Sequence, residues 1–147
     1  RLVSTQNACN LLNRVYEYGL AETCFRERVS LLAYSPLAFG YLTGKYTVDP
    51  HAKGRVTQFP NFGRRYTKVN VKPAVAHYID IAKKHSLTPT QLALSWIYHR
   101  WYAASTIIGA TTVDQLRENI MSWDIRLSDD ARADIEAAHL RYTNPAP

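Results

Sequence analysis

The sequence predicts an α/β protein with a parallel sheet. Three short segments, residues 2–6, 29–34 and 103–108, are interpreted as β-strands, and the last two are apolar runs of strand length. Each segment leads through a loop into sequence with helical periodicity, which is typical of βα units in a parallel sheet. A chain of 147 residues is long enough for one domain with a hydrophobic core. We therefore expect one α/β domain over residues 1–147.

The second strand is the most distinct of the three. Residues 29–34 form a compact apolar run that stops at Ser35-Pro36, because proline lacks the amide that a strand ladder needs. All three runs are interpreted as strands buried on both faces, as in parallel sheets. Residues 35–71 are rich in Gly, Pro, Asn and basic residues, with a short helix expected at 37–45. Loops of this length are usually functional or disordered.

Helical spacing of apolar residues predicts five more helices, at residues 20–28, 72–85, 89–100, 113–122 and 128–139. Thr88 as N-cap and Pro89 in the first position favour the start of the third. Ser128, followed by two aspartates, marks the start of the last. Three or four βα units cannot close an eight-stranded barrel, so a further segment is needed to cover the strands. An open doubly wound sheet is the alternative.

The net charge of +6 does not indicate a nucleic-acid partner. Arg55, Arg64, Arg65 and Lys68 lie in one stretch, but no recognition motif accompanies them. A phosphorylated small molecule explains a local positive loop equally well. The apolar stretches are far shorter than the roughly 18 residues of a membrane span, so no membrane partner is expected.

Two cysteines, Cys9 and Cys24, are too few and too loosely spaced for a disulfide framework or a zinc site. They suit a reducing compartment, and we expect a cytoplasmic protein. The segment after Arg1 has no long apolar run typical of a signal peptide, and no initiator Met precedes it. The chain is therefore expected to begin inside a larger gene product.

Ligands of parallel α/β sheets collect at the carboxyl ends of the strands, so function is expected in the loops after Gln6, Tyr34 and Ile108. Gln6 and Asn7 carry amides that both donate and accept hydrogen bonds. The ring of Tyr34 can stack on a flat heterocycle. Lys45, in the loop that follows, can cover a diphosphate.

The third loop has features of a phosphate site. Gly109 lets the backbone approach a ligand, and Thr111 and Thr112 precede a helix whose free N–H groups favour an anion. Three polar side chains share a face of this helix: Gln115, Glu118 and Asn119. The alternative is that Thr111 or Thr112 only caps the helix.

Taken together, these segments resemble a known family. The strings from Leu32 to Tyr46 and from Ile107 to Thr112, with the polar residues of the helix that follows, are similar to the aldo-keto reductases, in particular their Tas-like branch, which is related to potassium-channel β subunits. The similarity runs in order over essentially the whole chain. It implies the C-terminal part of a (β/α)8 TIM barrel, with about three to four βα units.

The resemblance also implies NADP(H) as cofactor. Gln6 would contact the nicotinamide carboxamide and Tyr34 would stack on its ring, while Lys45 would help to hold the pyrophosphate. Residues after the third strand would surround the adenosine and its 2′-phosphate. The implied cofactor-binding residues are Gln6, Tyr34, Ser35, Pro36, Leu37, Ala38, Lys45, Ile107, Gly109, Thr111, Gln115, Glu118 and Asn119.

By the same resemblance, the function is NADPH-dependent reduction of a small aldehyde or ketone to the alcohol by hydride transfer. The family's catalytic Asp, Tyr, Lys and His sit in its N-terminal half, and none of them maps onto this chain. The alternative is a non-catalytic nucleotide-binding module that acts with a separate N-terminal half. The expected partners are that half-barrel or a second copy of the chain.

No local residue is predicted to replace the absent acid–base group, and no cluster has the spacing of a metal site. The histidines are scattered over loops and helix faces without a paired carboxylate at a useful spacing. We expect all five at the surface or rim: His51, His77, His85, His99 and His139.

Overall fold

The computed structural model describes residues 2–59 and 61–147. Its sheet has three strands, β1 (Ser4–Ala8), β2 (Ser30–Tyr34) and β3 (Ala103–Thr106), in the order β1-β2-β3. Both neighbouring pairs are parallel. The chain is thus the α/β protein that the sequence predicts. The outer edges of β1 and β3 pair with no other strand in the described part of the chain.

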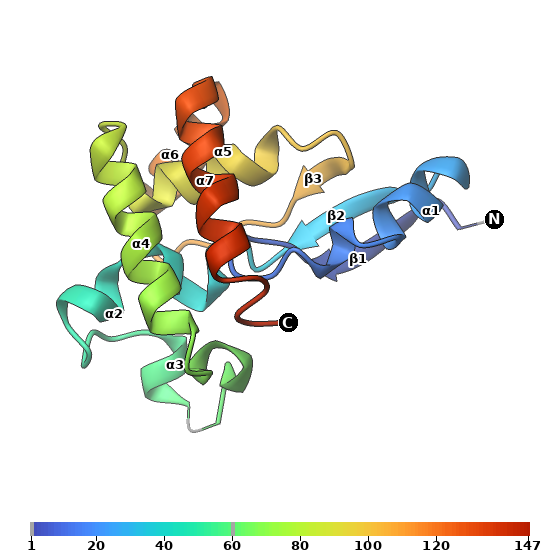
Figure 1. The fold of residues 1–147 in the computed structure, drawn as a ribbon. Coiled ribbons are helices and arrows are strands. Elements are labelled where there is room, and N and C mark those ends of the chain that lie inside the picture. The colour runs from blue at the N-terminus through green and yellow to red at the C-terminus, as the bar shows by residue number, and fades with distance from the viewer. Residues whose placement is uncertain (1, 60) are drawn as a thin grey trace.

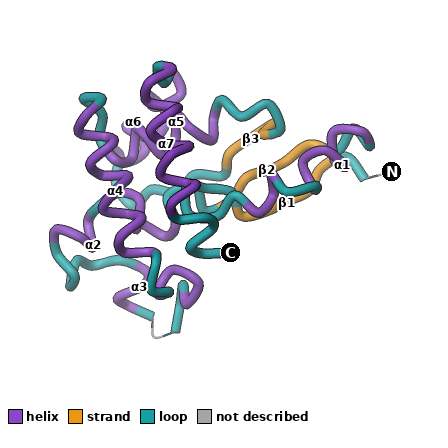
Figure 2. The backbone as a smooth tube through the Cα atoms, in the orientation of Figure 1, coloured by secondary structure: helices purple, strands orange, loops and turns teal. Residues whose placement is uncertain are grey.

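Helices surround this small sheet unevenly. The sheet and α1 lie on one side in Figure 1, whereas α2 to α7 gather on the other, and the tube in Figure 2 shows the same division. Short 3-10 turns occur at Val15–Glu17, Ala38–Thr43, Arg64–Thr67 and Ser122–Asp124. The α-helices are α1 (Leu20–Arg26), α2 (Lys45–Val48), α3 (Arg55–Gln58), α4 (Val71–Lys84), α5 (Pro89–Tyr98), α6 (Val113–Met121) and α7 (Asp129–Arg141). Among the described residues, none of these helices has the length and hydrophobicity that crossing a membrane requires.

The predicted helix starts are confirmed. The Thr88 hydroxyl accepts a hydrogen bond from the Gln91 N–H, Gln91 Oε1 accepts one from the Thr88 N–H, and Pro89 opens α5. Ser128 caps α7 by accepting from the Ala131 N–H. Two orphan donors are satisfied at the first cap and one at the second.

The first strand begins two residues later than predicted. Leu2 and Val3 are exposed, and the register with β2 begins at Ser4, opposite Ser30. Gln6 therefore lies within β1 and not at its end. The limits of the strand follow the hydrogen bonding to β2, which apolar composition alone does not reveal.

Within this chain the strands are not buried on both faces, which agrees with the prediction that a further segment is needed to cover them. In β2, Leu31 and Ala33 are buried, whereas Ser30 is exposed and Leu32 and Tyr34 are half-buried. This alternation means that one face packs on the core while the other lacks a full cover. Two elements are shorter than predicted: α1 ends at Arg26 and β3 ends at Thr106, each two residues before the predicted end. The long segment after β2 contains short helices.

A buried ion network joins the loop after β1 to α5 and α7. The Arg14 side chain, 7% exposed, pairs with Glu17 at 2.7 Å and Glu136 at 2.9 Å. Its guanidinium and that of Arg100 lie 5.2 and 4.3 Å from the ring centroid of Trp96. Charges this deep are tolerated because they are paired and stacked.

Residues near the end of the described chain pack against the same loop. The Asn144 side-chain oxygen accepts from the Arg14 N–H at 2.6 Å, and the Ala146 N–H donates to the Leu12 carbonyl at 3.0 Å. Pro145 and Ala146 are buried. The loop after β1 is therefore held in place by a segment about 130 residues away in sequence.

The prediction that all histidines lie at the surface or rim is wrong for His139, which is 7% exposed. Burial, followed by the nearby Arg14, lowers the pKa of His139 below its ordinary 6.5, and Tyr18 lies 3.0 Å from its Nε2. Arg100 also lowers this pKa, while Glu136 and Glu17 raise it. The spacing of apolar residues on α7 did not predict that His139 is buried. Histidine has an apolar ring with polar nitrogens, so its residue type alone does not indicate burial or exposure.

This histidine gives stability a predicted pH dependence. A group with a lowered folded-state pKa contributes stability that is present above its unfolded value of 6.5 and is lost as the pH falls through the folded value. We expect the free energy of unfolding to decrease below pH 6.5, as measured by urea denaturation at a series of pH values. His139→Gln should flatten this slope. A slope of equal size in the variant would contradict the prediction.

Candidate functional site

The loops after β1 and β2 are tied together by Asn10. Its Nδ2 donates to the Ser35 carbonyl at 2.9 Å and to the Tyr66 hydroxyl at 3.2 Å, and its Oδ1 accepts from the Leu12 N–H. Asn10 is fully buried. We did not predict a role for it, since asparagine in a loop usually signals only a turn.

The segment after β2 has an unusual backbone. Ser35, Ala38 and Phe39 have φ values of 54°, 49° and 56°, the left-handed region that residues with a Cβ seldom adopt. Such conformations cluster at binding sites, where surrounding contacts hold them. Tyr34 precedes this segment as a half-buried side chain at the end of β2. Pro36 and Ala38 are buried, and Leu37 is half-buried.

Lys45 starts α2 and is held over an aromatic ring. Its Nζ lies 4.8 Å from the ring centroid of Tyr46 and donates to the Lys53 carbonyl at 3.3 Å. A Cβ on Gly54 would lie 2.1 Å from the Tyr46 hydroxyl and 2.8 Å from Lys45 Nζ, so any larger residue would displace these side-chain ends. The folded-back segment limits the positions that the ammonium group can reach.

The loop after β3 leads into the N-terminus of α6. Thr112 is the N-cap, accepting from the Gln115 N–H at 3.3 Å, as the capping alternative proposed. Thr111 is exposed and donates from both its N–H and its hydroxyl to Gln115 Oε1. The N–H groups of Gly109 and Ala110 donate to no described residue, and the space beside Gly109 is open to 4 Å.

The polar face of α6 holds this loop from behind. Asn119 is buried, and its Nδ2 donates to the Gly109 carbonyl at 3.2 Å. Glu118 Oε1 accepts from the Thr88 hydroxyl at 2.7 Å. Together with Gln115, these side chains contact three different partners, so in this structure they shape the loop and do not converge on one point.

The N-terminus of α5 joins the second and third loops. Thr88 bonds to Glu118 on α6, while the ring of Pro89 lies 3.7 Å from a Cβ built on Gly44, next to Lys45. The loops that carry Lys45 and Thr111 therefore flank the same helix start. Gln6 remains exposed on β1, and Ile107 is held by its N–H bond to the Ala33 carbonyl.

The site thus has a strained loop with an aromatic residue, a confined ammonium group and open N–H groups at a helix N-terminus, all at the carboxyl ends of parallel strands. The model of the Aldo/keto reductase family matches residues 1–139. The chain belongs to the aldo/keto reductase family. The parallel βα units described above are accordingly part of the (β/α) barrel of this family.

Several characterised members are similar to this aldo/keto reductase chain. The chain is 50% identical to the protein Tas of Escherichia coli (strain K12). The matched region covers all of this chain and 42% of Tas. An aldo-keto reductase of Babesia bovis is 37% identical over 97% of this chain and 53% of the relative. The L-glyceraldehyde 3-phosphate reductase of Escherichia coli is 32% identical over 82% of this chain and 36% of the relative. The chain thus spans about half or less of the length of these relatives.

Proposed function

We propose that this chain is the NADP(H)-binding part, spanning residues 1–147, of an enzyme that reduces an aldehyde or ketone to an alcohol. The observation that carries the proposal is the pair of N–H groups at Gly109 and Ala110 that donate to no described residue, in the loop that precedes the nine-residue helix α6. Free N–H groups and the helix dipole at such a position favour a phosphate. The exposed Thr111 hydroxyl, which donates to Gln115 Oε1 in this structure, lies beside them.

The remaining residues fit the other parts of a dinucleotide. Tyr34, half-buried at the end of β2, offers a ring face to the nicotinamide, and the exposed amide of Gln6 lies on the neighbouring strand. Lys45 offers a cation for the pyrophosphate. When bound, the reduced cofactor supplies a hydride, while the chain binds and orients it. The remaining cofactor-binding residues in the proposal, Ser35, Pro36, Leu37, Ala38, Ile107, Gln115, Glu118 and Asn119, shape the loops around it.

The names of two further relatives bear on the choice of cofactor. One, 30% identical, is an NADH-specific methylglyoxal reductase, and another, also 30% identical, carries NADP(+) in its name. Both forms share the pyrophosphate and differ in the 2′-phosphate. We infer a preference for NADPH from the open anion position before α6, where Thr111 lies.

The second candidate function is a nucleotide-binding module without turnover. It is favoured by two described histidines that are not available as proton donors to a substrate. His139 is buried, and His85 Nε2 lies 2.7 Å from Asp134 Oδ2. Neither lies in the three loops of the site. The proposed enzyme therefore depends on a proton donor from an N-terminal part, such as that of Tas. We also propose that the protein lies in the cytoplasm.

The cofactor assignment is tested with two substitutions. Thr111→Glu places a carboxylate against the 2′-phosphate and should weaken NADPH far more than NADH, whereas Lys45→Ala should weaken both through the pyrophosphate. A charge-assisted hydrogen bond contributes about 1.5–3 kcal/mol, so the loss is roughly ten- to a hundredfold. Fluorescence titration gives the dissociation constants, using the Tas chimera, in which the N-terminal part of E. coli Tas precedes this chain.

Thr23→Glu is the matched control, because Thr23 is an exposed threonine on α1, at the other end of the sheet. It should leave both affinities unchanged. Equal losses of NADH and NADPH in the Thr111 variant would remove the 2′-phosphate assignment. Unchanged binding in both test variants would overturn the nucleotide site itself.

A further inference from the structure

A cavity of about 230 Å³ lies at the other end of the sheet. Ser30, the first residue of β2, and Ala104, near the start of β3, form part of its lining. Tyr34, by contrast, ends β2, roughly 13 Å further along the strand. The cavity is therefore separate from the candidate nucleotide site, and nothing in the proposed reduction uses it.

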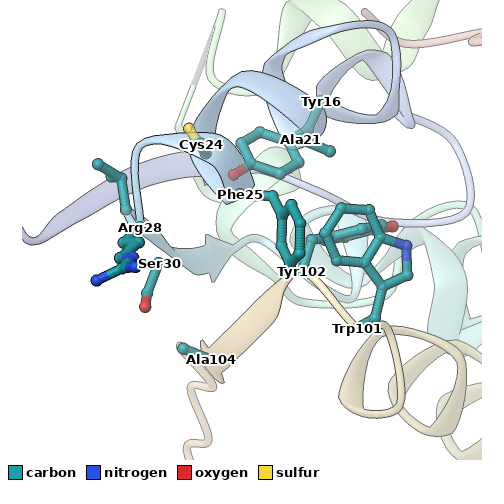
Figure 3. Close-up of a pocket in the computed structure, with 10 residues that line it drawn as sticks. Tyr16, Ala21, Cys24, Phe25, Arg28, Ser30, Trp101, Tyr102 and Ala104 are labelled. Atoms are coloured by element: carbon teal, nitrogen blue, oxygen red, sulfur yellow. The ribbon is translucent and has the colours of Figure 1, made fainter.

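One side of the cavity is aromatic. The rings of Phe25 and Trp101 meet edge to face with centroids 5.5 Å apart, and Trp101 contacts Tyr102 at 5.4 Å. Phe25 and Trp101 are 69% and 67% exposed, whereas Tyr16 and Tyr102 are buried and form the inner wall. Figure 3 shows the rings around the cavity. Large apolar side chains gathered at a hollow, instead of scattered singly, indicate a binding surface.

The other side carries a free cation. Figure 3 shows Arg28 and Ser30 across the cavity from Phe25 and Trp101. The Arg28 guanidinium forms no ion pair or hydrogen bond with any described residue, whereas Arg26, the last residue of α1, pairs with Glu22 at 2.6 Å. No acidic residue lines the cavity. Its charge is therefore positive and uncompensated.

The backbone keeps Arg28 at this position. Its φ of 53° lies in the left-handed region, and its N–H donates to the Phe25 carbonyl at 3.1 Å, while the Val29 N–H donates to the Cys24 carbonyl at 2.8 Å. These bonds end α1 in a tight turn. The turn places Phe25 and Arg28 on facing sides of the cavity, so an aromatic ring and a cation face one space.

We propose that this cavity binds a small aromatic carboxylate with a single ring. The ring packs against Phe25 and Trp101, and the carboxylate is bound by the Arg28 guanidinium, with the Ser30 hydroxyl as a further donor. A guanidinium matches a carboxylate through two parallel hydrogen bonds. The volume is below the usual 300–1,000 Å³ of ligand pockets, which restricts the ligand to one ring.

The test uses benzoate as the probe and the 147-residue chain, with isothermal titration or the fluorine NMR signal of 4-fluorobenzoate as the readout. We expect saturable binding at one site. Arg28→Gln, which removes the charge and shortens the side chain, should weaken benzoate at least tenfold. The neutral analogue benzamide should bind the parent chain and this variant equally. Trp101→Ala should weaken both ligands.

Two controls separate this site from others. Arg26→Gln changes an exposed arginine two residues before Arg28 and should leave benzoate binding unchanged, as should Lys45→Gln in the nucleotide site. Arg28 is exposed and unpaired, so its variant should keep the native NMR spectrum. Absence of saturable binding, or equal affinity in the parent and the Arg28 variant, would overturn the proposal, and so would a loss confined to Lys45→Gln.

Discussion

The Tas chimera is expected to reduce 4-nitrobenzaldehyde with NADPH, whereas the 147-residue chain alone should consume no NADPH above background. Bound cofactor can offer a hydride, but the acid–base residues of the family are expected on an N-terminal part outside this chain, so we expect the product alkoxide to lack its proton donor here. Missing general acid catalysis alone costs a factor of about 10² to 10⁴. Absorbance at the NADPH band measures both rates.

The chimera is structurally reasonable because this chain leaves the outer edges of β1 and β3 free for further strands. Its sequence is 50% identical to the corresponding part of Tas, so the contact surfaces should match closely. Lys45→Ala in the chimera provides the control and should raise the NADPH concentration needed for half-maximal rate. Ordinary turnover by the isolated chain would refute the prediction and would require a proton donor among these residues.

Arg14→Ala is expected to destabilise the fold by about 3–5 kcal/mol, since it removes one partner from a buried ion network. Glu17 and Glu136 then lose a cation at 2.7 and 2.9 Å, and Trp96 loses one of its two stacked guanidinium groups. Urea denaturation followed by circular dichroism measures the change. Much of the cost comes from leaving the Glu17 carboxylate, 19% exposed, without its cation, and less from Glu136, which is 48% exposed.

Two further variants isolate this cause. Arg26→Ala breaks an exposed pair with Glu22 and should cost no more than about 1 kcal/mol. Combining Arg14→Met with Glu136→Gln removes charge from both sides and should recover part of the loss. A single Arg14 variant as stable as Arg26→Ala would show that the network contributes little.

Most of the architecture could be predicted from local signals. Helix α5 follows from Thr88 and Pro89, which act through bonds within one turn, and β2 from a run of apolar residues ended by Pro36. The limits of β1 could not be predicted, because they depend on pairing with β2 across the sheet. The strand propensity of residues 2–8 does not identify the strand with which they pair.

The same distinction applies to the candidate site. The capping role of Thr112 followed from its place before a helix, and it is confirmed. Asn10 and the buried His139 were missed, because their partners lie far away in sequence: Ser35 and Tyr66 for Asn10, and Tyr18 for His139. The assignment of individual residues to parts of the cofactor rests on family resemblance and stays a prediction.

The bonds from Asn144 and Ala146 to the loop after β1 have a consequence for biosynthesis. A ribosome makes residues 10–14 long before residues 144–146, so this loop forms its final contacts only after residues 144–146 have left the exit tunnel. Contacts so distant in sequence form slowly, because a large loop must close first. During this interval Leu11 and Leu12, fully buried in the finished protein, are exposed to chaperones and to neighbouring nascent chains.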